Sequence, residues 1–180
     1  PFIFEFGVFI DVPARALHLG FALFLVFLTY PYKKQDRDKN FGFFSFLLSL
    51  IGFFCTLYIF FGYEGLVNRN GILLKYNFSI LGNNFIFPTE LIIGLIGIIL
   101  LLEATRRSIG LPLVVVASIF YLYSYFGQSM PELISHQGLS LKRLVGYHWF
   151  GGEAIFGIPI SVSVSFVFLF VLFGSMLDYA

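Results

Sequence analysis

The residues of this sequence that could do chemistry are a few charged side chains set beside long apolar runs. Glu90 begins one such run, and Glu103 with Arg106 and Arg107 ends it. Because charge is costly in lipid, each of them is a candidate for ion binding, proton transfer or a contact between helices. For Glu90, two interpretations stay open: an ion or proton site, or an interfacial carboxylate that the dipole of a helix N-terminus stabilises.

Glu103 and Arg107 have the spacing of an ion pair on one helix face, since they are residues i and i+4. The pair is interpreted either as an anchored helix end with arginines that reach toward the interface, or as a clamp or hinge between helices. His18 begins another apolar run and is interpreted as a hydrogen-bonded interfacial histidine in preference to a ligand. The single cysteine, Cys55, excludes an internal disulfide framework and is interpreted as a small apolar filler.

The stretch from Glu153 to Pro159 is a second group of candidates. Gly157 and Pro159 predict a broken or delayed start for the next helix, which is how transporters expose backbone groups at membrane depth. Ser161 and Ser165 would then share one face of that helix. They are interpreted either as polar contacts or as small residues at a helix packing surface.

A third group lies in segment 130–152, where apolar residues alternate with polar ones that include His136, Lys142 and Arg143. This alternation predicts a helix that lies at the membrane surface. Trp149, near the end of the segment, is typical of the aromatic belt at the membrane interface.

None of the common catalytic motifs occurs in the sequence, whether of zinc proteases, P-loop proteins or serine hydrolases. We therefore expect no enzyme, no metal centre and no covalently bound cofactor. A membrane-embedded enzyme such as an acyltransferase would need a catalytic pair near one interface, for which His18 and Asp11 are the only candidates. The net charge of +1 implies no nucleic-acid partner.

Composition indicates that the elements carrying these residues are transmembrane helices. The chain is 58% hydrophobic and 12% charged, whereas soluble chains carry about 25% charged residues. Three runs lack Asp, Glu, Lys and Arg altogether, and each is long enough to cross a hydrocarbon core of roughly 30 Å as a helix. We predict an all-α, polytopic transmembrane helix bundle in the lipid bilayer. It would have about five spans plus the interfacial amphipathic segment, and a loop over 63–84. The spans are predicted at 14–30, 41–61, 85–104, 110–126 and 155–177.

The distribution of Lys and Arg predicts the orientation of the bundle. The basic segments 33–39 and 105–109 are expected in the cytoplasm, which places 63–84 and 128–152 outside. The first span would then run inward, so we expect that one span precedes it. Because both ends of the chain adjoin apolar patterns, we also expect it to be part of a longer protein.

Four separated stretches resemble, in order, the membrane proteins of TRAP transporters in which a small and a large subunit are fused, the type paired with TAXI binding proteins. They are Arg15-Ala-Leu-His-Leu-Gly-Phe-Ala-Leu23 with Tyr30-Pro31, Leu102-Glu-Ala-Thr-Arg-Arg-Ser-Ile-Gly-Leu-Pro112, His136-Gln-Gly-Leu-Ser-Leu-Lys-Arg-Leu144, and the apolar run from Ile155 to Gly174.

The resemblance implies a sodium-coupled importer of organic acids in a bacterial or archaeal cytoplasmic membrane, served by an extracytoplasmic TAXI-type solute-binding protein. On that map, 1–104 holds the last three helices of the small four-helix part, and 105–180 holds the first two helices of the large permease part. The family's substrate and sodium sites fall mostly beyond Ala180, so no ion ligand is transferred to a residue of this chain. The outward segment 130–152 would meet the docked binding protein, with Lys142 and Arg143 as candidate contacts.

A membrane-embedded sensory or receptor domain is the alternative. The two classes differ in the residues expected after Ala180: further apolar spans for a transporter, or a soluble helix leading to a signalling domain for a sensor.

Overall fold

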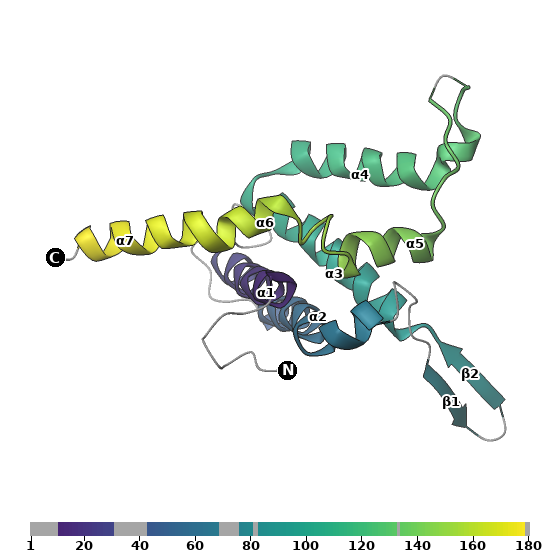
Figure 1. Ribbon diagram of the computed structural model, residues 1–180, viewed down its shortest axis with the longest axis horizontal. Helices are drawn as coiled ribbons and strands as arrows, with labels where there is room; N and C mark the ends of the chain where they lie inside the picture. Colours follow the sequence, from purple (N-terminus) through teal and green to yellow (C-terminus); the bar gives the residue numbers. More distant parts are fainter. Residues whose placement is uncertain (1–10, 31–42, 69–75, 81–82, 133, 179–180) are drawn as a thin grey trace.

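The computed structural model describes residues 11–30, 43–68, 76–80, 83–132 and 134–178, and these are mostly helical (Figure 1). Each long helix coincides with one of the apolar runs in the sequence, because a helix satisfies its backbone hydrogen bonds internally. The first four long helices are α1 (Asp11–Thr29), α2 (Phe43–Asn68), α3 (Thr89–Ser108) and α4 (Leu111–Phe126).

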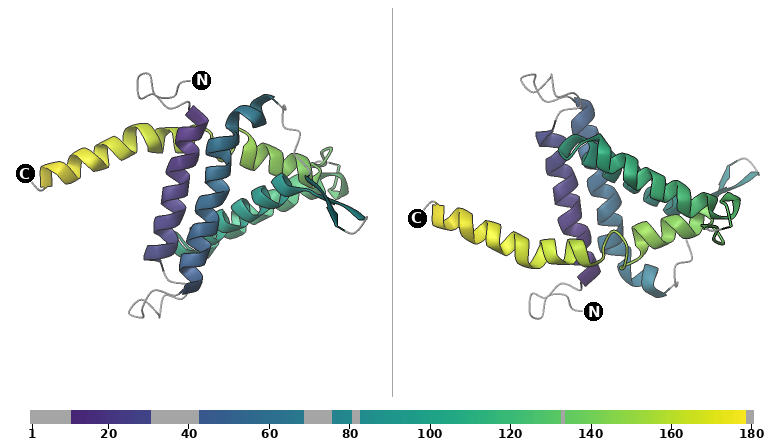
Figure 2. Two further views of the ribbon diagram at one scale, coloured as in Figure 1. Left: turned by 90° about the horizontal axis from the view of Figure 1, so that it is seen from below. Right: turned by 90° about the horizontal axis from the view of Figure 1, so that it is seen from above.

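The core of the protein lies between α1, α2 and α3. Helices α1 and α2 lie side by side, and α3 crosses them obliquely (Figure 2). Phe27 of α1, Ile59 of α2 and Ala104 of α3 all belong to one buried cluster. This three-helix unit holds most of the buried side chains and is the frame for the polar contacts described below.

Between α2 and α3 the chain forms an antiparallel two-stranded ribbon in which Tyr76 pairs with Phe87. Its strands are β1 (Tyr76–Ile80) and β2 (Asn83–Phe87). The prediction of a loop over 63–84 is wrong at both ends, since α2 continues to Asn68 and the ribbon begins at Tyr76. The aromatic and β-branched residues among the asparagines favour extended, paired strands.

After α4, a single turn of 3-10 helix, η2 (Gly127–Ser129), leads through an irregular stretch to α5 (Leu141–Val145) and a π-helical turn, η3 (Gly146–Phe150). Of the described residues in the predicted surface segment 130–152, ten are helical, and they are those of α5 and η3. Their buried side packs on α3, where Trp149 lies against Gly97 and Val145 against Gly94. The assignment of Trp149 to the interfacial belt is therefore wrong: the indole is fully buried, because the two glycines leave room for it.

The last apolar run forms one helix in three parts, α6 (Ile158–Val162), the π-helical η4 (Ser163–Val167) and α7 (Phe168–Asp178). Its start agrees with the prediction, since Gly157 is the N-cap and Pro159 lies in the first turn. Helix α7 leads away from the three-helix unit (Figures 1 and 2). None of the described side chains in these three parts is buried.

Four of the described helices are long and apolar enough to cross a membrane, which is compatible with a multi-pass membrane protein. Helix α3 has the length of a span but carries two acidic and two basic residues, so its crossing stays a prediction. The basic segment 33–39 lies outside the described residues, and the orientation drawn from it also stays a prediction. The four spans are Val12–Thr29, Phe43–Tyr63, Leu111–Ser129 and Ile158–Asp178.

Candidate functional site

Among the described residues, polar contacts between helices lie at the carboxyl end of α3, at its amino end, and at the junction of α1 with the last helix. In each place a polar side chain of one helix reaches another helix within a mainly apolar body. Because such contacts are few in lipid-embedded proteins, they mark the positions where helices are held in register.

At the carboxyl end of α3, Glu103 accepts hydrogen bonds from both arginines. Its Oε2 lies 2.7 Å from Nε of Arg106, and its Oε1 lies 2.8 Å from Nη2 of Arg106 and 2.8 Å from Nε of Arg107. The two arginines differ in their surroundings, because the side chain of Arg106 is 29% exposed and that of Arg107 is 1% exposed. The carboxylate thus balances a buried cation on one side and an exposed one on the other.

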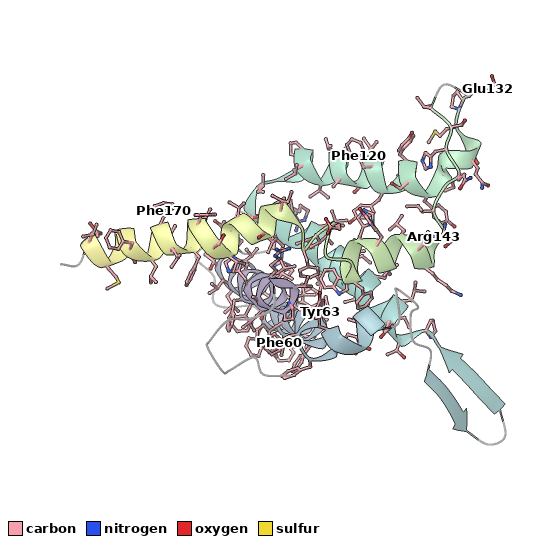
Figure 3. All side chains as sticks on the ribbon, in the orientation of Figure 1. Phe60, Tyr63, Phe120, Glu132, Arg143 and Phe170 are labelled. Atoms are coloured by element: carbon pink, nitrogen blue, oxygen red, sulfur yellow. The ribbon has the colours of Figure 1, made fainter. Side chains whose placement is uncertain are left out.

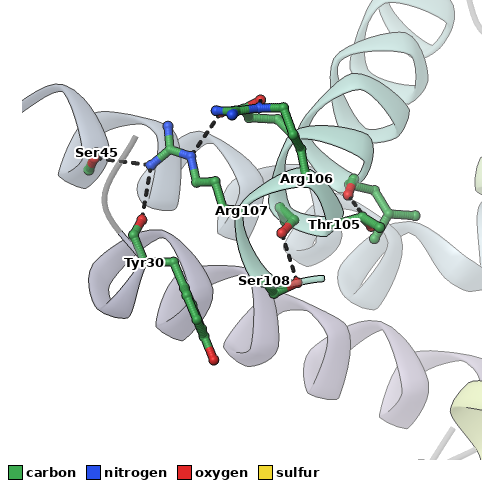
Figure 4. Close-up of polar contacts among 9 residues, drawn as sticks. Tyr30, Ser45, Thr105, Arg106, Arg107 and Ser108 are labelled. Atoms are coloured by element: carbon green, nitrogen blue, oxygen red, sulfur yellow. Dashed lines mark hydrogen bonds and ion pairs between the residues drawn. The ribbon is translucent and has the colours of Figure 1, made fainter. Parts of the chain in front are cut away.

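Arg107 also connects α3 to both neighbouring helices (Figure 4). Its Nη1 donates to Oγ of Ser45 in α2 at 3.1 Å and to the carbonyl oxygen of Tyr30, just after α1, at 3.4 Å. Its Cζ lies 4.9 Å from the centroid of the Phe27 ring. Of the two interpretations of this cluster, the clamp between helices fits Arg107, and the anchored, partly exposed helix end fits Arg106.

At the amino end of α3, Glu90 is fully buried and accepts a hydrogen bond from the hydroxyl group of Tyr58 in α2 at 2.9 Å. Its place in the first turn of the helix is the predicted one. Glu90 is buried, whereas an interfacial carboxylate would be exposed to solvent. The ring of Tyr58 also meets Phe150 of η3 edge to face, with 6.4 Å between the centroids. Glu90 and Tyr58 therefore join α2 to α3 at the place where η3 packs on them.

The third place is the junction between α1 and the start of the last helix. Arg15 Nη1 donates to the carbonyl oxygen of Phe156 at 2.8 Å, and His18 Nε2 lies 3.1 Å from Oγ of Ser163. Arg15 and His18 are one turn apart on α1, so a single face of α1 holds both the segment before the last helix and its π-helical part. The backbone turns sharply at Gly157, where a Cβ atom would collide with the carbonyl oxygen of Glu153.

In the last helix, Ser163 contacts α1, whereas the sequence singled out Ser161 and Ser165. The hydroxyl of Ser165 donates to the carbonyl oxygen of Ser161 at 2.8 Å, within its own helix. Ser163 is the first residue of the π-helical turn. Periodicity within one helix does not tell which of its faces meets α1, so the sequence pattern could not single out Ser163.

The remaining candidates lie apart from these contacts. Lys142, Arg143 and Glu153 are exposed. Within the described ranges, no three His, Cys, Asp or Glu side chains gather to hold a metal ion. Sequence reasoning gave Arg15 no role in a site, although a charge inside the first apolar helix was a usable signal. It also missed Tyr58, for which no pattern was available.

A scan against models of protein families gives no match, and searches of curated proteins and of solved structures likewise find no similar protein.

Proposed function

We propose that this chain is the membrane part of a sodium-coupled, binding-protein-dependent secondary transporter of the TRAP type that imports organic acids. The observation that carries the proposal is the interrupted start of the last helix. A glycine N-cap, a proline in the first turn and a π-helical turn succeed one another there, and α1 holds them through Arg15 and His18. Discontinuous helices and π-bulges recur where membrane transporters handle their substrates.

In this proposal the two parts of the chain have different tasks. Residues 1–104 act as scaffold, which accords with the packed unit formed by α1, α2 and the part of α3 that ends at Ala104. Residues 105–180 begin the transport part, whose apolar helices α4 and α7 leave their surfaces open to further helices or lipid. Sodium is the coupling ion, and the protein binds and moves its substrate without an enzymatic step. A TAXI-type binding protein delivers the organic acid outside the cytoplasmic membrane.

The proposal is tested by uptake of radiolabelled organic acids into proteoliposomes that hold the complete product of the gene. We expect uptake only when an inward sodium gradient and the binding protein are both present. Absence of uptake by a folded protein under every gradient, across a broad panel of acids, would contradict the proposal and favour the sensory alternative.

A matched pair of glycine variants links the transport assay to the interrupted helix. We expect Gly157→Ala to reduce uptake strongly, because its Cβ would meet two backbone carbonyl oxygens. Gly62→Ala in α2 is the control, since nothing lies within 4 Å of a Cβ at that position. Equal uptake by the two variants would remove the interrupted helix start from the mechanism.

A further inference from the structure

The carboxyl end of α4 and the neighbouring α5 form one exposed surface with apolar, aromatic and cationic parts. Only 6% of the span that α4 contributes is buried. Phe120 is 65% exposed and Phe126 is 48% exposed. Acyl chains are a suitable cover for an apolar helix of this kind in a membrane protein.

The chain returns beside α4 close to the point where that span ends. The N–H group of Leu139 donates to the carbonyl oxygen of Ser124 at 2.8 Å, and α5 begins two residues later. Farther along, the rings of Tyr121 and His148 lie 4.9 Å apart. Figure 3 places Arg143 on the end of α5 that lies toward the carboxyl end of α4. The cations of α5 therefore lie near the end of the candidate span that contains α4, which is where lipid headgroups would begin.

Lys142 and Arg143 are both exposed, and no carboxylate in the described part of the chain pairs with either. Two partly exposed tyrosines accompany them, Tyr125 at the end of α4 and Tyr147 in η3. Tyrosines and cations at the end of an apolar span are typical of the interface, where their polar groups meet lipid headgroups.

We propose that Lys142 and Arg143 bind the phosphate group of an anionic phospholipid whose acyl chains lie along α4. The guanidinium of Arg143 offers a fork of donors to the phosphate oxygens, and the ammonium of Lys142 adds a point charge. A lipid fits this surface better than a soluble protein does, because the cations lie beside the carboxyl end of α4, whose exposed side chains are mainly apolar. The inference needs only the membrane location of the chain and not the proposed transport function.

Trp149 provides a local probe, since it is the one tryptophan of this sequence and lies on the π-helical turn directly after α5. The complete protein, with any other tryptophan replaced by phenylalanine, is placed in nanodiscs that contain phosphatidylglycerol or phosphatidylcholine with pyrene-labelled acyl chains. Energy transfer from Trp149 to pyrene reports lipid at the surface. We expect transfer from phosphatidylglycerol to saturate at a lower fraction of labelled lipid than transfer from phosphatidylcholine.

The K142Q/R143Q double variant should need roughly thirtyfold more phosphatidylglycerol for the same transfer, because each of the two lost interfacial cations contributes about 1 kcal/mol. The K142R/R143K swap keeps both positive charges and one guanidinium at the surface, so it should bind far more tightly than the neutralised variant. The proposal would be overturned if energy transfer rose equally with the fraction of either labelled lipid. It would also be overturned if the K142Q/R143Q variant showed the same dependence on phosphatidylglycerol as the unchanged protein. It would also fall if neutralisation left lipid binding intact and abolished only uptake that depends on the binding protein, since the cations would then serve a protein partner.

Discussion

Arg107 is the residue whose replacement tests the reasoning on helix contacts most directly. The substitution Arg107→Met keeps an apolar side chain of similar length over Phe27 and removes the charge and the hydrogen bonds. The hydrogen bonds from Nε to Glu103 at 2.8 Å and from Nη1 to Ser45 at 3.1 Å are both lost. We expect the three-helix unit to be weakened, because α3 loses its polar connection to α2 and to the end of α1.

The size of the loss can be worked out from the geometry. Hydrogen bonds in membrane proteins contribute about 0.6 to 1.7 kcal/mol each, and a cation over an aromatic ring contributes about 0.5 to 2 kcal/mol. Glu103 keeps its two hydrogen bonds to Arg106, so the penalty of about 3–5 kcal/mol for an orphaned buried charge does not apply. We therefore expect Arg107→Met to lower the free energy of unfolding by about 2–3 kcal/mol.

The assay is reversible unfolding of the purified protein in mixed micelles, monitored by circular dichroism as the denaturing detergent is increased. Arg106→Met is the matched control: it removes a partner of the same carboxylate, but from a side chain that is 29% exposed, where an ion pair contributes less than about 1 kcal/mol. Equal losses in the two variants would refute the reasoning, because burial of Arg107 would then have no energetic consequence.

Two further predictions concern contacts of α3 and α1. Gly97→Ala should expel the indole of Trp149, costing about 1–3 kcal/mol and shifting its fluorescence to the red, whereas Gly62→Ala should leave the spectrum unchanged. A double-mutant cycle of His18→Ala and Ser163→Ala should give a coupling of about 0.5–1.7 kcal/mol in the same unfolding assay, and additive losses would contradict the contact at 3.1 Å.

Much of the fold could be predicted from the sequence alone, because the determining signals are local. The apolar runs are longer than those of helices in soluble proteins. They therefore predicted a membrane protein and the approximate bounds of the long helices. Gly157 and Pro159 predicted the start of the last helix, since their backbone preferences act within one turn. The spacing of Glu103 and Arg107 likewise predicted their ion pair, because neighbours on one helix face need no other element.

The tertiary structure decided which polar residues meet across helices. No local signal indicates that Arg107 reaches Ser45 or that Arg15 reaches the carbonyl group of Phe156, since these contacts depend on how the helices cross. The burial of Trp149 depended in the same way on Gly97, which lies on another helix. Periodicity tells which residues share a face of one helix, but the partner of that face is set by packing among all the helices, which no single segment of sequence contains.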